Sequence, residues 1–333
     1  MQRNFIRQQG ILGVATALVI AVAGCTGSTQ GDSDTAAGSD DAAAGDVAED
    51  DSKIDVVASY SVICDLTSQI AADSVDLKCL IPPDQDPHTY EAKPSDREAV
   101  DAADVVFYAG LNFEPSIIDM ATASDSEAPK IALHDESVQE LIEAEEDGEL
   151  EPDPHVWHDV ENGLAMVELI RDNLIKVDPD NTDLYTENAE KLTAKLKALD
   201  TWIPEQIATI PEDKRRLITT HDAMSYYAAA YGLEVEGTLL GVSTEEEPSA
   251  AQVEELANAI REKGIPTIFA ELTSDDRVLK TVAGEADVEI SENVLLADGL
   301  GAEGTPGATY TGMLEYNTCS IVEGLGGECS PTP

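Results

Sequence analysis

The chain is poor in basic residues, with 19 Lys and Arg against 67 Asp and Glu in 333 residues, a formal net charge of −48 at pH 7. This excess disfavours nucleic acid and other polyanions as partners and leaves cations open. The aromatic share of 5% argues against an aromatic-lined carbohydrate groove. The sequence contains neither a G-x-x-x-x-G-K-[ST] loop nor an H-E-x-x-H motif. It therefore predicts neither ATP hydrolysis nor a zinc hydrolase of that type.

Apolar runs at the N-terminus are short. The stretch Gly10 to Ala23 has 14 residues and follows Arg3 and Arg7, which is typical of a secretory signal rather than a membrane span. It ends at Gly24-Cys25, which looks like a lipobox. We predict a lipoprotein signal peptide over residues 1–24 and acylation of Cys25, and the alternative is an ordinary signal peptide with an incidental cysteine.

The segment after Cys25 has almost nothing to bury. Residues 26–52 contain eight acids and no base, a composition that favours disorder and an extended chain. We predict an acidic tether over residues 25–52, which holds the folded part on the outer side of the cell membrane. Contact with the membrane would then run through the lipid anchor alone.

Four cysteines remain, and none is part of a C-x-x-C motif: Cys64, Cys79, Cys319 and Cys329. Two short-range disulfides, Cys64 with Cys79 and Cys319 with Cys329, are the simplest pairing among the three possible ones. Free buried thiols are the alternative. A zinc–thiolate site is less well supported by the spacing.

From residue 53 onward, short apolar runs alternate with amphipathic stretches, which predicts an α/β fold. The expected strands fall in two series, at 54–59, 76–81, 105–109 and 130–133, then at 216–220, 233–240, 267–271 and 288–290. The expected helices are at 62–72, 95–102, 249–262, 275–283 and 309–324. Two α/β lobes with mainly parallel sheets follow from this pattern.

A different segment lies between the two series. Apolar residues from Tyr185 to Ile207 recur at spacings of three and four, which predicts one long amphipathic helix starting near Thr182, with Pro204 kinking or restarting its last turn. We expect a first lobe over 53–178, a linking helix over 179–210 and a second lobe over 211–333. The lysines of this helix should form a solvated face.

Histidine is scarce, and three of the five histidines have unusual settings. His88 and His155 each end an Asp-Pro-His sequence, and His221 directly follows an expected strand. Open α/β sheets place ligands at the carboxyl ends of strands. Three imidazoles and a carboxylate would suit a tetrahedral zinc site. A lone histidine is more often a loop residue bonded to the backbone, so the repeated motif carries the hypothesis.

Several motifs then carry a resemblance. Five segments of the sequence resemble the metal-binding receptors of ABC transporters. In chain order they are Asp86-Pro87-His88-Thr89-Tyr90-Glu91, Asp153-Pro154-His155-Val156-Trp157-His158, Thr220-His221-Asp222, Gly241-Val242-Ser243-Thr244-Glu245 and Ala297-Asp298-Gly299-Leu300. The resemblance, to the cluster A-I (TroA-like or ZnuA-like) receptors, covers nearly all of residues 54–325.

This resemblance implies a metal site of His88, His155, His221 and Asp298 at the interface of two lobes joined by a rigid helix. It implies that His158 and His134 are not ligands. It also implies that Glu271 is not a ligand, and an ion pair with Arg277 or Lys280 is the simple account of that acid. His221 and the Irving–Williams order favour Zn²⁺ as the transported ion. Mn²⁺ stays open, because the region 140–151 lacks the histidine-rich loop of many zinc receptors.

The implied function is capture of the metal by a monomeric extracytoplasmic lipoprotein, which delivers it to an ABC permease driven by a separate ATPase. The chain would then be no enzyme. The alternatives are a surface adhesin of the same fold and a secreted zinc hydrolase. A hydrolase would need an open coordination position, which four protein ligands would close.

Overall fold

The protein is described by a computed structural model that covers residues 53–146, 149–273 and 276–332. The predicted signal peptide, Cys25 and the tether lie outside the described residues.

The first lobe is built on a parallel sheet with the strand order β2-β1-β3-β4. Its strands are β1 (Ile54–Ala58), β2 (Val75–Cys79), β3 (Val105–Tyr108) and β4 (Lys130–Ala132). The central strands β1 and β3 carry buried apolar runs, as required when helices cover both faces of a parallel sheet. The helices of this lobe are α1 (Ser61–Ala71), α2 (Pro94–Ala102), α3 (Pro115–Thr122) and α4 (Leu133–Ser137).

The second lobe contains two parallel strand pairs, β7 (Arg216–Thr219) with β8 (Glu234–Thr238) and β9 (Thr267–Ile268) with β10 (Glu289–Ile290). A hydrogen bond from Phe269 N to Ile218 O (2.9 Å) ties the two pairs together. The helices are α7 (Ser225–Tyr231), α8 (Ala250–Lys263), α9 (Asp276–Ala286) and α10 (Tyr310–Gly324). The predicted two-lobed α/β fold is confirmed.

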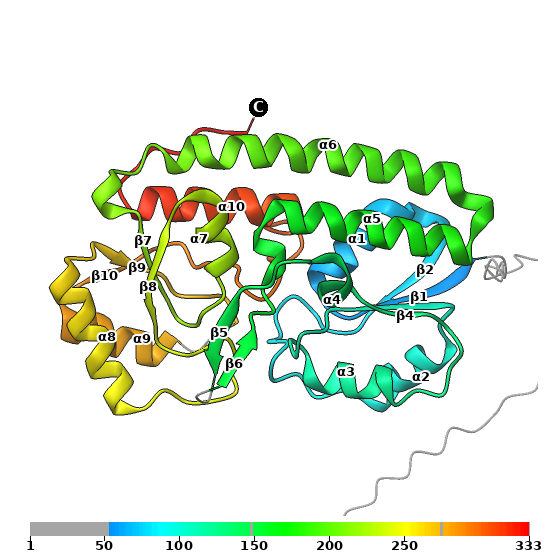
Figure 1. Cartoon of the computed structure of the whole chain (residues 1–333), viewed down its shortest axis with the longest axis horizontal. Coiled ribbons are helices and arrows are strands. Elements are labelled where there is room, and N and C mark those ends of the chain that lie inside the picture. Colours follow the sequence, from blue (N-terminus) through cyan, green and yellow to red (C-terminus); the bar gives the residue numbers. More distant parts are fainter. Residues whose placement is uncertain (1–52, 147–148, 274–275, 333) are drawn as a thin grey trace, which may run out of the picture. The chain divides into compact units, whose positions relative to one another are not determined.

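The long helix α6 (Thr182–Ile207) runs along both lobes, next to α10 and α5 (Val160–Val177) (Figure 1). Its 26 residues correspond to about 39 Å. The predicted apolar stripe is buried, and the lysines of this helix are exposed. The expected restart at Pro204 is wrong, because α6 continues through this residue and ends three residues later, at Ile207.

The acidic region before His155 forms a hairpin that the sequence did not predict, in which β5 (Glu143–Glu146) pairs antiparallel with β6 (Glu149–Pro152). The hairpin is tied to the second lobe by a hydrogen bond from Ile142 N to the Tyr226 hydroxyl oxygen (3.0 Å).

Both expected disulfides are present. Cys64 in α1 is bonded to Cys79 in β2, and Cys319 in α10 is bonded to Cys329 in the C-terminal tail, with Cα–Cα distances of 5.8 and 5.3 Å. The tail also accepts a hydrogen bond at Ser330 O from Trp202 Nε1 of α6 (3.2 Å). The two bridges therefore join elements within each lobe.

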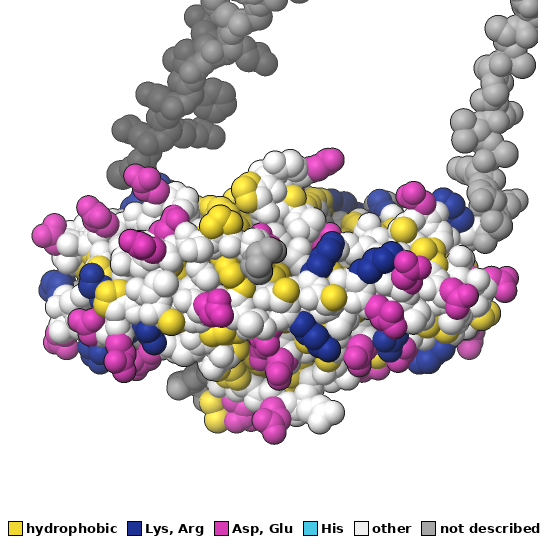
Figure 2. Space-filling model, turned by 90° about the horizontal axis from the view of Figure 1, so that it is seen from above, with side chains coloured by type: hydrophobic (Ala, Val, Ile, Leu, Met, Phe, Trp, Pro, Cys, Tyr) yellow, Lys and Arg dark blue, Asp and Glu magenta, His cyan; other side chains and the backbone are white. Residues whose placement is uncertain are grey.

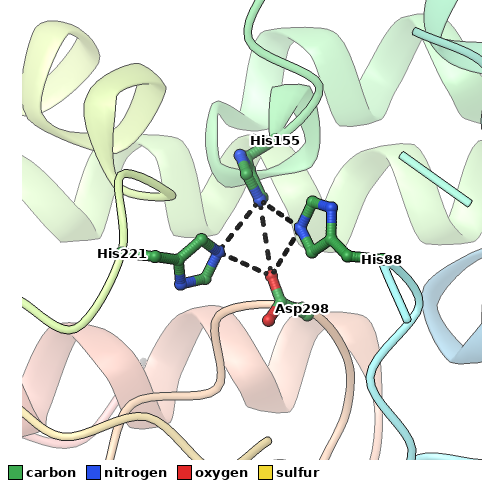
Figure 3. A group of neighbouring side chains, drawn as sticks. All are labelled: His88, His155, His221 and Asp298. Atoms are coloured by element: carbon green, nitrogen blue, oxygen red, sulfur yellow. Dashed lines mark hydrogen bonds and ion pairs between the residues drawn. The ribbon is translucent and has the colours of Figure 1, made fainter. Parts of the chain in front are cut away.

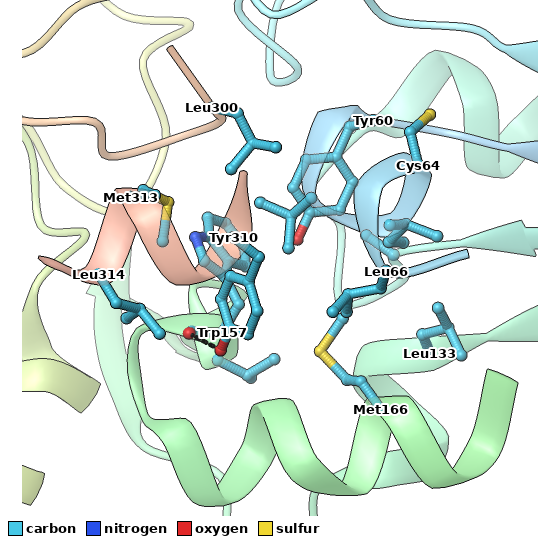
Figure 4. Packing of buried hydrophobic residues seen from close by; sticks show 14 of the residues in the cluster. Tyr60, Cys64, Leu66, Leu133, Trp157, Met166, Leu300, Tyr310, Met313 and Leu314 are labelled. Atoms are coloured by element: carbon cyan, nitrogen blue, oxygen red, sulfur yellow. Dashed lines mark hydrogen bonds between the residues drawn. The ribbon is translucent and has the colours of Figure 1, made fainter. Parts of the chain in front are cut away.

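Two hydrophobic cores hold the chain together. The larger core contains the buried apolar side chains of the first lobe. It also contains Leu296 and Leu300 from the segment before α10, and Tyr310 from α10 itself (Figure 4). The smaller core lies between the sheet of the second lobe and helices α8 and α9, and includes Ile218 and Leu279. The two cores thus do not coincide with the two lobes.

The surface that carries α6 shows basic side chains scattered among acidic ones (Figure 2). In the part of the chain that the structure describes, each helix is either too short or too polar to cross a bilayer.

Candidate metal centre

The four predicted ligands come from four separate segments that converge between the lobes. His88 lies between β2 and α2, and His155 lies between β6 and the 3₁₀ turn Val156–His158. His221 follows β7 after one intervening residue, and Asp298 lies between β10 and α10. The position of His221, just past the carboxyl end of β7, agrees with the usual placement of ligand sites in α/β sheets.

The donor atoms of these four residues all lie within 4.8 Å of one another (Figure 3). The His155 Nε2 atom is 3.3 Å from His88 Nε2 and 3.2 Å from His221 Nε2. The Asp298 Oδ1 atom is 3.1, 3.4 and 3.8 Å from the Nε2 atoms of His221, His155 and His88. Four donors at about 2.0–2.1 Å from a tetrahedral Zn²⁺ would be separated by about 3.3 Å, so the spacing fits such an ion.

All four side chains are buried. Asp298 Oδ1 has no hydrogen-bond partner within the described residues, although three imidazoles face it. Burial alone would raise the pKa of Asp298, but His221, His155 and His88 hold that pKa well below its usual range. Burial alone would lower the pKa of His221, but Asp298 and Glu271 raise it well above its ordinary value. A buried anion surrounded by basic nitrogens is a site where a cation can replace protons.

The repeated Asp-Pro-His motif has a structural explanation. In each copy the aspartate Oδ1 accepts the backbone N–H of the histidine two residues later, at 2.9 Å for both Asp86–His88 and Asp153–His155. Asp153 Oδ1 also accepts a hydrogen bond from His155 Nδ1 (2.8 Å). With Nδ1 engaged in this way, Nε2 is the atom that His155 presents to the centre.

His221 is oriented by Glu271, and sequence reasoning missed this contact. The Glu271 carboxylate accepts a hydrogen bond from His221 Nδ1, and also the backbone N–H groups of Thr220 (2.9 Å) and His221 (3.1 Å). Of the two expected ion-pair partners of Glu271, Lys280 is wrong, because it pairs with Asp276 (2.6 Å), and Arg277 stays a prediction. No local signal links Glu271 to His221, since 50 residues separate them.

The other two histidines are buried but lie outside the group of four. His134 is 3.1 Å, through Nε2, from the Tyr60 hydroxyl. His158 Nε2 is 2.9 Å from Ala297 O. Burial, with a smaller contribution from His155, lowers the pKa of His158 to about 4, so its imidazole is neutral at pH 7.

A protein-family model described as the periplasmic component A of a zinc-uptake complex (ZnuA) matches residues 56–324. The chain belongs to this family. Members of the ZnuA family are substrate-binding receptors of metal ABC transporters rather than enzymes, so the prediction that the chain is no enzyme is confirmed and the hydrolase alternative is wrong.

Comparisons with individual proteins support the assignment to the ZnuA family. The chain is 32% identical over 325 residues to a manganese ABC transporter substrate-binding lipoprotein, PsaA, from Streptococcus anginosus, with 96% of this chain and 99% of the relative covered. It is also 32% identical to the manganese-binding lipoprotein MntA of Halalkalibacterium halodurans, with 83% and 90% covered. Among solved structures, the periplasmic zinc-binding protein TroA from Treponema pallidum superposes with a TM-score of 0.78 at 32% identity, with 82% of this chain and 99% of that chain covered.

Proposed function

We propose that His88, His155, His221 and Asp298 capture one divalent transition metal ion, with Zn²⁺ as the preferred ion. The observation that carries this proposal is the convergence of three imidazole nitrogens and one carboxylate oxygen, which all lie within 4.8 Å of one another, with Asp298 Oδ1 at 3.1–3.8 Å from the three nitrogens and His155 Nε2 at 3.2–3.3 Å from the other two. Nitrogen-rich, four-coordinate sites suit Zn²⁺, and Zn²⁺ exceeds Mn²⁺ in affinity at most sites of this kind.

Mn²⁺ is the second candidate, because the relatives PsaA and MntA carry manganese in their names. Mn²⁺ favours oxygen ligands and higher coordination numbers. Asp298 Oδ2 accepts a hydrogen bond from Thr273 (2.9 Å), which favours coordination through Oδ1 alone and hence the lower coordination number.

We propose further that the chain is anchored through acylated Cys25 and delivers its ion to an ABC permease coupled to an ATPase. Two observations support this. The relatives PsaA and MntA are named lipoproteins, and the Cys25 motif has the corresponding form. The ligands come from both lobes, so a permease that separates the lobes would dismantle the centre.

The test is native mass spectrometry of the purified chain titrated with Zn²⁺, with Mn²⁺, and with an equal mixture. We expect one ion per chain, and Zn²⁺ to displace Mn²⁺ from the mixture. Retention of Mn²⁺ against equal Zn²⁺ would contradict the choice of metal. A chain that retains neither ion would contradict the function itself.

Replacing Glu271 with glutamine is expected to weaken Zn²⁺ binding by about 10- to 100-fold, the usual cost of losing a group that orients a metal-bound histidine. Glutamine has one acceptor oxygen where Glu271 uses both of its oxygens. Competition with a chromophoric chelator measures the change in dissociation constant. The matched control is Glu254→Gln on α8, which removes the same charge from an exposed position. Equal affinities of the two variants would show that Glu271 does not orient His221.

A further inference from the structure

His158 is a buried histidine that the proposed centre does not use as a ligand. Its side chain is fully inaccessible, and its Nδ1 atom has no hydrogen-bond partner within the described residues. Burying an unpartnered polar atom lowers stability, and an apolar side chain would avoid that cost. The remaining ring nitrogen, Nε2, donates a hydrogen bond to Ala297 O at 2.9 Å.

The bonded carbonyl group belongs to the peptide unit that leads directly into Asp298. The surrounding backbone is held on both sides. Asn317 binds the N–H and the carbonyl oxygen of Leu296 (2.9 Å each), and Ser61 Oγ accepts the N–H of Leu300 (2.9 Å). His158 is thus the side chain that fixes the peptide unit between these two attachments, next to the residue that carries the carboxylate.

The other end of His158 is joined to a second ligand. His158 closes the 3₁₀ turn that follows His155, and its backbone N–H donates to His155 O (3.4 Å). The imidazole ring packs on Trp157, with ring centroids 5.2 Å apart. One residue therefore connects the backbone of His155 to the backbone of Asp298, whose donor atoms lie 3.4 Å apart.

We propose that His158 is a positioning residue, which keeps the Asp298 carboxylate at coordinating distance from His155 through the Nε2–H···O bond to Ala297. This inference rests on the proposed metal-binding function and deepens it. With this bond in place, the Asp298 carboxylate would stay where a bound ion can coordinate it. Without the bond, the segment 296–300 would rely on its flanking attachments and on the hydrogen bond from Thr273 to Asp298 Oδ2 (2.9 Å), and the carboxylate would leave the ion more often.

The test compares His158→Gln with His158→Met in the purified, Zn²⁺-loaded chain. The two replacements have similar length and volume, but only glutamine places an N–H near the position of Nε2. Release of Zn²⁺ into an excess of chromophoric chelator gives the dissociation rate. We expect dissociation about tenfold faster for His158→Met, and within about threefold of the wild-type rate for His158→Gln.

A purely packing role predicts the opposite order, because methionine would suit the apolar surroundings and glutamine would not. Equal rates for the two variants, or faster release from His158→Gln, would overturn the proposal. His158→Leu serves as a second apolar variant if His158→Met folds in low yield, and the rate is measured only on loaded, folded chains. The same tenfold acceleration is expected.

Asn173→Leu is the matched control. Asn173 is buried and donates Nδ2–H to Leu169 O (2.9 Å), and it lies 13 residues beyond the start of α5, about 20 Å along the helix. We expect the wild-type dissociation rate for this variant, even if its stability falls. If the wild-type chain itself binds no Zn²⁺, the proposed function fails. If it binds Zn²⁺ and all His158 variants release it at the wild-type rate, only the positioning role fails.

Discussion

Replacing Asp298 with alanine is expected to weaken Zn²⁺ binding by a hundredfold or more. Asp298 supplies the only anionic donor among the four residues of the centre. Tetrahedral zinc sites in small domains bind with about 10–16 kcal/mol, so an equal share per ligand is about 3 kcal/mol, which corresponds to more than a hundredfold. Three imidazoles would remain, and their Nε2 atoms would lie close together without a negative charge. Chelator competition measures the loss.

The control for this prediction is Asp178→Ala. Asp178 is a partly buried acid that, like Asp298, accepts hydrogen bonds from side chains, here those of Tyr185 (2.5 Å) and Asn181 (2.7 Å), but it lies at the far end of α5. Its loss should reduce stability and leave the dissociation constant for Zn²⁺ near the wild-type value. Wild-type affinity in Asp298→Ala would remove this residue from the centre.

Metal loading should raise the thermal stability of the chain strongly. The four ligands belong to segments that are 67, 66 and 77 residues apart along the sequence, so an unfolded chain has no preformed site. Free Zn²⁺ at a thousand times its dissociation constant would add about 4 kcal/mol. For a domain of this size, that corresponds to a rise of about 8 °C in the melting temperature.

Differential scanning calorimetry with Zn²⁺, and then with an excess of chelator, measures this shift and its reversal. Asp298→Ala should show little or no rise in melting temperature with Zn²⁺, since this variant lacks one of the four metal ligands. An unchanged melting temperature in the wild-type chain, at a metal concentration that saturates it, would mean that the ion binds the unfolded chain equally well.

Much of the fold follows from the periodicity of the sequence. The stripe from Tyr185 to Ile207 predicted α6, because a helix buried along one side repeats its apolar positions every three or four residues. Short apolar runs such as Val105–Tyr108 predicted the central strands. The lobe boundaries at residues 178 and 211 stay a prediction.

Other elements escaped prediction for physical reasons. The hairpin of β5 and β6 is rich in glutamate, which has low strand propensity, and its register comes from backbone pairing rather than from an apolar pattern. Helix α5 does carry a usable signal, with Met166, Ile170 and Leu174 buried at spacings of four, but it was not predicted.

The candidate ligands could be predicted because each lies in a recognisable local motif, and the resemblance supplied their grouping. The groups that orient them could be predicted only in part. Asp153 is two residues from His155, so a local turn explains the contact. Glu271 and Ala297 meet His221 and His158 from far along the chain. Such contacts depend on the packing of separate segments, which periodicity does not encode.

The division of the molecule into two cores has a consequence for partial unfolding. Trp157, Leu296 and Met224, near His155, Asp298 and His221, belong to the larger core, whereas helices α8 and α9 contribute buried residues to the smaller one. Small packing units open more readily than large ones. Amide hydrogens of α8 and α9 should therefore exchange with solvent sooner than those of β1 and β3, and such an opening would leave the segments that carry the four ligands packed on the larger core.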